Sequence, residues 1–250
     1  MTAAPDAAAL YEVCEATWPP AATRDHAGWI IRDGAGGGKR VSAATAAASA
    51  TLPDIAKAEA AMKSLDQRCL FQIRDGEKAL DDALAARDYD IIDRVAIYLC
   101  PVAELTRISP PRLAAFQIFP PLQIMADLWA AGGIGAERLA IMARARGSKM
   151  ALLARHNDRA AGVCFIGIHR DIAMLHALEV APALRRQGVA VNIMRVAAQW
   201  AQNQGANWLS VIVTEQNTGA NALYSSLGMK HVGHYHYRTE PQNHGRQGRI

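Results

Sequence analysis

The sequence predicts an α+β fold in which a mixed, mostly antiparallel central sheet is flanked by helices. Three strand-like runs with short polar turns between them occupy residues 150–155, 160–168 and 173–180. A long helical pattern and a further strand follow, ending near residue 214. The same order of strand, helix and strand also occurs between residues 69 and 99. Runs of both element types in this order are typical of an α+β domain.

The front half begins with a helical pattern from Pro5 to Thr17, which ends before the pair Pro19-Pro20. Residues 28–32 and 39–43 have the pattern of two hairpin arms, joined by the glycine-rich segment 33–38. This segment does not fit a phosphate-binding loop, because the first glycine and the hydroxyl residue of such a loop are missing. The later elements of this half are a helix at 54–65, a strand at 69–73, a helix at 78–87 and a strand at 89–99.

The back half shows two helical patterns before its strands, at residues 122–131 and 136–146, separated by a glycine-rich stop. The predicted apolar set of the first helix is Leu122, Ile124, Met125 and Leu128. After the three strands come a long helix to about Gln204, a strand at 208–214, a short helix that carries Tyr224, and a last strand at 230–238.

A proline-rich boundary, Ser109-Pro110-Pro111, divides the chain into two predicted domains at residues 1–110 and 111–240, followed by a frayed polar tail at 241–250. When the strand–helix–strand units of the two halves are overlaid, Leu84 falls at the position of Tyr224. We therefore expect the front half to be a decayed second copy of the same structural unit. Convergent patterning of strands and helices is the alternative explanation.

Composition limits the classes of function. The chain has 250 residues, of which 51% are hydrophobic and 20% charged, as is typical of a globular protein with a sizeable core. It has no apolar run of about 18 residues and no signal-peptide pattern, so we expect a cytoplasmic protein without a membrane partner. The net charge of +4 is modest and aromatic residues make up only 6%, so no nucleic-acid partner is expected.

The cysteines and histidines predict no metal site. The cysteines are isolated in sequence, which favours reduced thiols over a zinc ribbon or a disulfide framework: Cys14, Cys69, Cys100 and Cys164. A histidine cluster near the end has no cysteine or carboxylate at matching spacing, so we expect solvated side chains for His231, His234 and His236. Cys164 lies on a core strand with no obvious base beside it, which is an argument against a nucleophilic cysteine.

The stretch that carries the chemistry is an arginine-glycine segment between the strand at 173–180 and the long helix. The first turn of a helix leaves backbone N–H groups unpaired and carries partial positive charge. Gly188 has no Cβ, so a phosphate can approach the backbone, and Arg185 and Arg186 add positive charge beside it. Taken alone, this short segment leaves open an ordinary strand-to-helix connection with a solvated basic pair.

The wider pattern resembles the GNAT acetyltransferase superfamily. The spacing Arg185-x-x-Gly188-x-Ala190 is similar to the acyl-CoA signature of that superfamily. The later residues Asn217, Ala220, Leu223-Tyr224 and Gly228-Met229 are similar to its characteristic ending, with methionine where phenylalanine is usual. The resemblance covers roughly residues 132–238, and the front half resembles the inactive N-terminal domain of tandem GNAT proteins.

This resemblance implies acetyl-CoA as the acyl donor. Its phosphates would be held by Arg185 and Arg186 and by the backbone N–H groups of Gln187, Gly188, Val189, Ala190 and Val191. The pantetheine arm would pair like an extra strand with Leu178, Glu179 and Val180, and the N–H of Val180 would donate to the oxyanion. Tyr224 would protonate the leaving thiolate, and Asn217 would contact the cofactor or cap the following helix.

The general base is expected on the same strand. His176 titrates in the right range, and its strand is similar to that of serotonin N-acetyltransferases, where a second histidine stands at the position of Met174. Strand alternation places His176, Leu178 and Val180 on one face and Glu179 on the other, unless a bulge intervenes. A hydrogen-bonded core histidine is the alternative for His176, and Glu179 is expected to be structural or to contact the acceptor.

The predicted reaction is direct transfer of the acetyl group of acetyl-CoA to a primary amine of a small molecule in a ternary complex. Two alternatives remain: acetylation of a protein or peptide amine, and a non-catalytic acyl-CoA-binding protein with a regulatory role. The presence of Tyr224 and His176 favours the enzyme. The identity of the acceptor and the formation of a homodimer are left open by the sequence.

Overall fold

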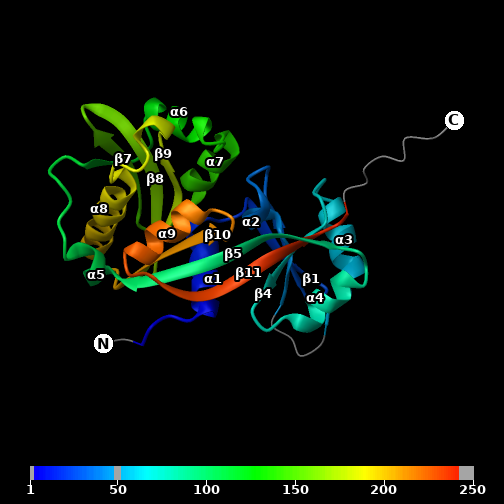
Figure 1. Ribbon diagram of the computed structural model, residues 1–250. Helices are drawn as coiled ribbons and strands as arrows, with labels where there is room; N and C mark the ends of the chain where they lie inside the picture. The colour runs from blue at the N-terminus through cyan, green and yellow to red at the C-terminus, as the bar shows by residue number, and fades with distance from the viewer. Residues whose placement is uncertain (1–2, 48–51, 242–250) are drawn as a thin grey trace.

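The computed structural model describes residues 3–47 and 52–241. In these residues an eight-stranded sheet has the order β4-β11-β5-β10-β9-β8-β7-β6, and a three-stranded sheet has the order β1-β2-β3. Figure 1 shows β5 and β11 running side by side from one half of the molecule to the other. The predicted α+β class and the mixed, mostly antiparallel sheet are confirmed. The predicted polar tail lies, apart from its first residue, outside the described residues.

The front half contains the helices α1 to α5 and the strands β1 to β5. Its helices are α1 (Ala7–Thr17), α2 (Lys39–Ser42), α3 (Ile55–Lys63), α4 (Lys78–Ala85) and α5 (Val102–Thr106). Its strands are β1 (Ala22–His26), β2 (Trp29–Asp33), β3 (Thr45–Ala46), β4 (Leu70–Arg74) and β5 (Asp90–Pro101). Asp6 and Asp54 cap α1 and α3 because their side chains accept hydrogen bonds from backbone N–H groups of the first turn.

The back half contains the helices α6 to α9 and the strands β6 to β11. Its strands are β6 (Ala115–Ile118), β7 (Lys149–His156), β8 (Arg159–His169), β9 (Ile172–Val180), β10 (Trp208–Thr214) and β11 (Lys230–Thr239). Its helices are α6 (Gln123–Ala131), α7 (Ala136–Arg144), α8 (Val189–Asn203) and α9 (Thr218–Ser226), with a 3-10 turn, η1, at Pro182–Leu184. No helix in the described part of the chain is long and apolar enough to span a membrane.

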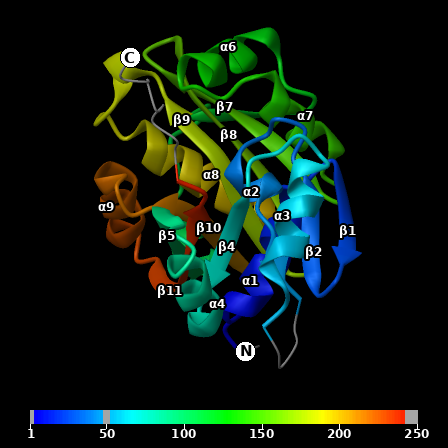
Figure 2. The ribbon, with the colours of Figure 1, turned by 90° about the vertical axis from the view of Figure 1, so that its right-hand side faces the viewer.

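The sheet of the back half is covered on both faces. Strands β6 to β9 pair antiparallel with their neighbours in chain order, and β10 returns parallel to β9 after α8. Cys164 and Ile166 of β8 pack toward α8, whereas Val163 and Phe165 pack toward α6, α7 and the end of α1. Figure 2 shows β7, β8 and β9 running between α8 and the α6–α7 pair. Two separate apolar cores therefore fix the position of β9.

The two halves exchange their last strands. Each half ends with a strand, a short helix and a last strand: β4-α4-β5 in the front half and β10-α9-β11 in the back half. In the sheet, β11 lies between β4 and β5, and β5 lies between β11 and β10. If each strand is replaced by its counterpart in the other half, β4 by β10 and β5 by β11, the order β4-β11-β5-β10 is obtained again, read from the opposite edge. The predicted boundary at residue 110 thus separates the two halves in the sequence, whereas strands from both halves alternate in the eight-stranded sheet.

A short parallel contact in the front half supports the predicted repeat. Ala44, next to β3, bridges to Phe71 of β4, and its N–H donates to the Leu70 carbonyl at 2.8 Å. The elements β3, α3 and β4 therefore have the same order and relative strand direction as β9, α8 and β10. This correspondence supports a decayed second copy, which stays a prediction together with the division into domains.

The predicted hairpin at residues 28–43 is wrong. Residues 39–42 form α2, and β2 pairs instead with the preceding strand, from Ala22 opposite Asp33 to His26 opposite Trp29. Gly38, with φ of 95°, directs the chain into α2, which its lack of a Cβ permits. Strands β1 and β6 are not predicted from the sequence, because both are short and largely exposed and neither alternates apolar with polar residues.

The buried face of α6 also differs from the predicted apolar set. Leu122 and Ile124 are 49% and 46% exposed, whereas Met125 and Trp129 are fully buried. The indole Nε1 of Trp129 donates to the carbonyl of Ala177 at 2.8 Å. A buried indole satisfies its N–H in this way, so α6 is oriented by a polar contact to β9 as well as by its apolar residues.

Candidate active site

A gap opens between β9 and β10. The two strands pair in parallel only from Ile172 opposite Trp208 to Leu175 opposite Val211, although β9 continues to Val180 and β10 to Thr214. Beyond Leu175, β9 keeps only its antiparallel partner β8. The sheet therefore presents unpaired backbone groups of β9 to this gap, which are open to pairing with an extended ligand.

A bulge in β9 accompanies the gap. The register between β8 and β9 shifts between Val163 and Phe165, so β9 has one more residue there than its partner. Ala177 takes a positive φ of 51°, which is rare for a residue with a Cβ. The hydrogen bond from Trp129 to the Ala177 carbonyl fixes this conformation. Strained backbone held by its surroundings is common at functional sites.

Because of the bulge, the side chains of β9 do not alternate between the two faces of the sheet as the sequence predicts. Leu178 and Val180 pack toward α8, while the carboxyl group of Glu179 lies against Gly132 at the end of α6. His176 contacts α1 on the same side as Glu179. His176 and Glu179 thus share a face, and the predicted grouping of His176 with Leu178 and Val180 is wrong. The extra residue at the bulge reverses the alternation for everything after it.

The backbone of the last β9 residues points two N–H groups into the gap. The N–H of Ala181 donates to the Ala161 carbonyl on the β8 side at 2.9 Å. Successive N–H groups of a strand point to opposite sides, so the N–H groups of Val180 and Leu178 point away from β8. This is the side on which β10 has already diverged. A ligand carbonyl in the gap would find both donors preorganised.

The arginine-glycine turn follows directly. Arg186 and Gly188 have positive φ angles of 63° and 80°, and α8 begins at Val189. In the described part of the chain, none of the backbone N–H groups from residue 186 to residue 191 donates to a protein acceptor. A Cβ on Gly188 would meet no atom within 4 Å, so the space before the helix is open. The turn therefore has the consecutive donors and the free volume that a pyrophosphate requires.

Arg185 lies across the entrance to the gap. Its Nε donates to the Val180 carbonyl at 3.1 Å, and its Nη2 contacts the Glu179 carboxylate at 3.0 Å. The arginine side chain is 57% exposed and Glu179 only 21%. The exposed guanidinium is free to turn toward an incoming phosphate, because a surface ion pair of this kind contributes less than about 1 kcal/mol.

Tyr224 lies on α9 inside the core packed against α8. Its ring centroid is 5.8 Å from that of Tyr98, and only 5% of the residue is exposed. Within the described residues, no hydrogen-bond partner occupies its hydroxyl group. Burial raises the pKa of Tyr224 above the ordinary value, and the neighbouring Cys164 adds to this. The phenol is therefore protonated at neutral pH, as a proton donor must be.

Asn217 caps α9. Its Oδ1 accepts a hydrogen bond from the Ala220 N–H at 3.0 Å. Asn221, one turn further on, joins the helix to the end of β10 through its bond to the Thr214 carbonyl at 3.0 Å. Tyr98 of β5 donates to the side chain of Asn221, also at 3.0 Å. These contacts position Tyr224 relative to β10, and β5, from the front half, contributes one of them.

His176 is a buried and neutral histidine. The Thr17 hydroxyl donates to the Val13 carbonyl, so its oxygen must accept the hydrogen bond from Nε2 of His176 at 2.8 Å. Nδ1 then accepts from Arg40 at 3.2 Å. Burial lowers the pKa of His176 well below its ordinary value, and the charge of Arg40 lowers it further. No nitrogen lone pair is left to accept a proton, so this geometry opposes the predicted role of base.

The hydrogen-bond partners of His176 and the Trp18 ring beside it come from the front half, and the sequence analysis predicted a role for none of them. Thr17 and Trp18 end α1, and the Trp18 ring lies 5.0 Å from the imidazole. Arg40 comes from α2, in the segment predicted as a hairpin arm. No local pattern marks these residues, because their roles depend on where the front half packs against β9.

The cysteine and the C-terminal histidines considered in the sequence analysis are not placed to act as a nucleophile or as metal ligands. Cys164 is fully buried, and burial raises the pKa of its thiol, so a thiolate nucleophile is not available there. His236 pairs with Asp81 at 2.8 Å and His234 with Asp75 at 3.0 Å. No group of three histidine, cysteine or carboxylate side chains placed to hold a metal ion occurs within residues 3–47 and 52–241.

The region that contains the gap, the turn and Tyr224 matches a known family. The sequence model of the acetyltransferase (GNAT) family covers residues 123–229. This region therefore belongs to the GNAT superfamily. Among curated proteins, the GNAT relative YobR of Bacillus subtilis (strain 168), an uncharacterized N-acetyltransferase, is 24% identical over 240 residues. That alignment covers 92% of this chain and 97% of the relative.

Solved structures show the same GNAT fold. A GCN5-related N-acetyltransferase from Kribbella flavida superposes with a TM-score of 0.73 at 17% identity, covering 97% of this chain and 98% of that one. A tandem GNAT protein from the clavulanic acid biosynthesis pathway superposes with a TM-score of 0.58 at 13% identity, covering 74% of this chain and 67% of that chain. The predicted GNAT fold is confirmed. The family match over residues 123–229 and the curated relative support the predicted N-acetyltransferase with an acyl-CoA donor.

Proposed function

We propose that this GNAT enzyme transfers the acetyl group of acetyl-CoA directly to a primary amine of a small molecule in a ternary complex. The observation that carries the proposal is the gap between β9 and β10, which leads straight to the unpaired N–H groups of residues 186–191. One extended ligand with a pyrophosphate at one end fits both features.

In the proposed complex, the pyrophosphate lies on the turn at Gly188, and Arg186 and the released Arg185 contribute positive charge. The pantetheine arm pairs with the backbone of Leu178, Glu179 and Val180 in the gap. This places the thioester carbonyl near the end of β9, where the Val180 N–H donates to its oxygen. One such preorganised donor contributes about 10²–10³ in rate in other acyl transfers.

The amine approaches from the face that carries α1 and α6, because α8 fills the other face of the sheet. Its nitrogen forms a bond to the acetyl carbon, the carbon–sulfur bond breaks, and the thiolate takes a proton from the Tyr224 phenol, which solvent reprotonates after the coenzyme leaves. The ammonium proton leaves through solvent or to Glu179, the partly exposed carboxylate on this face. His176 holds α1 and α2 against β9 and is assigned no proton transfer.

Packing on the acceptor side supports a small acceptor over a protein. The glycine-rich segment of the front half lies against α7: a Cβ on Gly37 would come within 2.6 Å of Ile141, and one on Gly36 within 3.1 Å of Glu137. This close approach brings the front half over the acceptor face of the back half. A folded protein surface would have little room there, whereas a small amine would fit.

Calorimetric titration of acetyl-CoA, followed by a thiol-release assay with a panel of small amines and lysine peptides, tests the proposal. Saturable binding with thiol release on a small amine is the expected result. Release on peptides alone would replace the small acceptor by a protein amine. Absence of binding would remove acetyl-CoA as the donor, and the same titration with longer acyl-CoA thioesters would then identify the acyl group.

A further inference from the structure

A cavity lies at the opposite end of β9 from the gap. Its volume is about 650 Å³, within the range of small-molecule sites. Its walls are the end of α1, the start of β1, the residues after α7, and the turn between β8 and β9. At about 3.3 Å per residue, the two ends of β9 are about 26 Å apart, so the cavity is separate from the acyl-CoA site.

The cavity has an excess of positive charge. Its basic wall residues are Arg144, Arg146, His169 and Arg170. The acidic wall residue Glu15 is neutralised by Arg32, which donates to both of its oxygens at 2.9 and 2.8 Å. Glu12 in turn neutralises Arg170, at 3.1 Å. Arg146 has no ion pair or hydrogen bond within the described residues.

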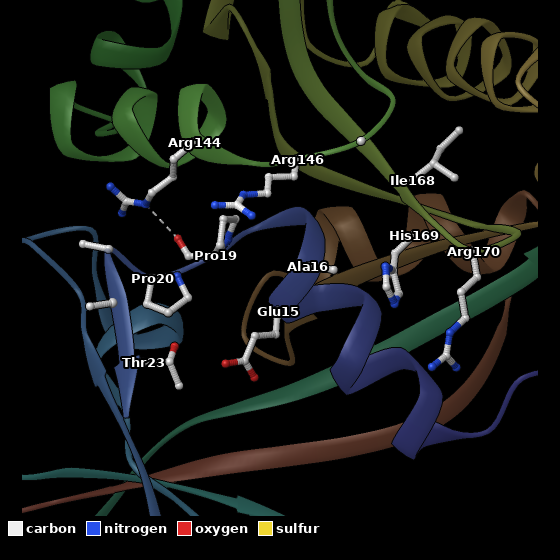
Figure 3. Close-up of a pocket in the computed structure, with 13 residues that line it drawn as sticks. Glu15, Ala16, Pro19, Pro20, Thr23, Arg144, Arg146, Ile168, His169 and Arg170 are labelled. Atoms are coloured by element: carbon white, nitrogen blue, oxygen red, sulfur yellow. Dashed lines mark hydrogen bonds between the residues drawn. The ribbon is translucent and has the colours of Figure 1, made fainter. Parts of the chain in front are cut away.

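The unpaired guanidinium points into the cavity. Figure 3 shows Arg146 extending from above and the imidazole of His169 entering from the other side, with Glu15 below them. Arg144 lines the same wall, where its Nε donates to the Pro19 carbonyl at 3.0 Å. Its Nη2 is buried and has no acceptor among the described residues. Buried donors without acceptors are rare and mark places where a partner is missing.

Apart from Thr23, the rest of the lining is apolar or glycine. Pro19, Pro20 and Ile168 form much of the wall, together with small alanine side chains. A site with a few converging cationic groups against an apolar wall selects for a ligand with an anionic head and an apolar body. Planar guanidinium groups are suited to carboxylate and phosphate oxygens in particular.

We propose that this cavity binds a small organic dianion, with a phosphate monoester head group on Arg146 and His169 and an apolar body against Pro19, Pro20 and Ile168. Arg144 completes the cationic wall. The head group replaces water around the exposed Arg146, and the apolar body excludes water from the proline wall. The site is independent of acetyl transfer, because no residue of the proposed reaction lines it.

The test is a calorimetric titration of phenyl phosphate, with inorganic phosphate as the comparison. Saturating coenzyme A is present throughout, so that the turn at Gly188 is occupied. We expect one molecule of phenyl phosphate to bind per chain, and to bind more tightly than inorganic phosphate. We expect Arg146→Ala to weaken this binding about ten-fold or more, as the loss of a charged hydrogen-bond donor implies.

The matched control is Arg107→Ala, which removes an exposed arginine outside the cavity, paired with Glu104 at 2.8 Å. Its affinity for phenyl phosphate should equal that of the unaltered protein. The proposal is overturned by equal affinity in Arg146→Ala, by the absence of binding at millimolar concentration, or by equal affinity for the two phosphates. If coenzyme A does not bind, the proposed function fails, and the same comparison in a Gly188→Glu background still decides this site.

Discussion

Replacing Gly188 by glutamate tests the anion-binding turn directly, because the substitution separates strain from charge. Gly188 has φ of 80°, and a Cβ there meets no atom within 4 Å, so the new side chain is strained but does not clash. Left-handed backbone costs about 1–2 kcal/mol for a residue with a Cβ. That cost is present with and without ligand, so it lowers the free energy of unfolding and leaves the affinity unchanged.

The negative charge of the new glutamate, unlike the backbone strain, lowers the affinity for acetyl-CoA. A carboxylate about 5 Å from one phosphate charge is repelled by about 3 kcal/mol at an effective dielectric constant of about 20. This corresponds to a rise in the Kd of acetyl-CoA on the order of 10²-fold. Isothermal titration measures the Kd, and thermal unfolding of the same sample measures the stability.

Gly205 provides a matched control at the other end of α8. It has φ of 85°, and its Cβ would also meet no atom within 4 Å. Gly205→Glu should therefore lose a similar amount of stability and keep the affinity for acetyl-CoA. If Gly188→Glu binds acetyl-CoA within three-fold of the unaltered protein, the pyrophosphate does not lie on this turn and the reasoning is refuted.

Two further predictions concern the proposed reaction, and a third concerns the stability of the fold. Tyr224→Phe should lower kcat by about 10² or more with little change in the Kd of acetyl-CoA, and unchanged turnover would remove the phenol from the mechanism. His176→Gln should keep the pH profile of turnover, because the neutral imidazole is structural; loss of an ionisation near neutrality from that profile would restore it as the base. Below pH about 6.5 the unfolded chain protonates His176 and the folded chain does not, so the free energy of unfolding should fall as pH decreases, by up to about 1.4 kcal/mol per unit. Denaturant titrations at pH 7.5 and 5.5 measure this fall, and an equally steep fall in His176→Gln would show that other groups cause it.

The turn at Gly188 could be predicted from the sequence because its information is local. A strand, a glycine and a helical pattern adjoin in the chain, and the structure places the unpaired N–H groups where this order implies. The same holds for α3, β4, α4 and β5, each of which has its own periodicity. Local sequence patterns therefore suffice to predict most elements of the fold and the proposed phosphate site.

The errors arose where distant residues decide the local structure. Residues 39–42 lack a strand partner because β2 pairs with β1, and the segment becomes a helix after Gly38. The bulge at Ala177 is held by a hydrogen bond from Trp129 of α6, and the sequence of β9 alone contains no signal that predicts it. His176 looks like a base in sequence, but Thr17 and Arg40, more than 100 positions away, occupy both of its nitrogens.

The exchange of β5 and β11 has a consequence for how the chain reaches its native state. As the chain leaves the ribosome, β4 and β5 are complete early, yet the place between them stays empty until β11, at the far end of the sequence, has been synthesised. Pairings of such long sequence separation form slowly, and unpaired strand edges invite misassociation in the meantime. The active-site half in turn lacks the neighbour of β10 until β5 docks. Loss of the front half would therefore remove a central strand, β5, from the sheet that carries the proposed active site.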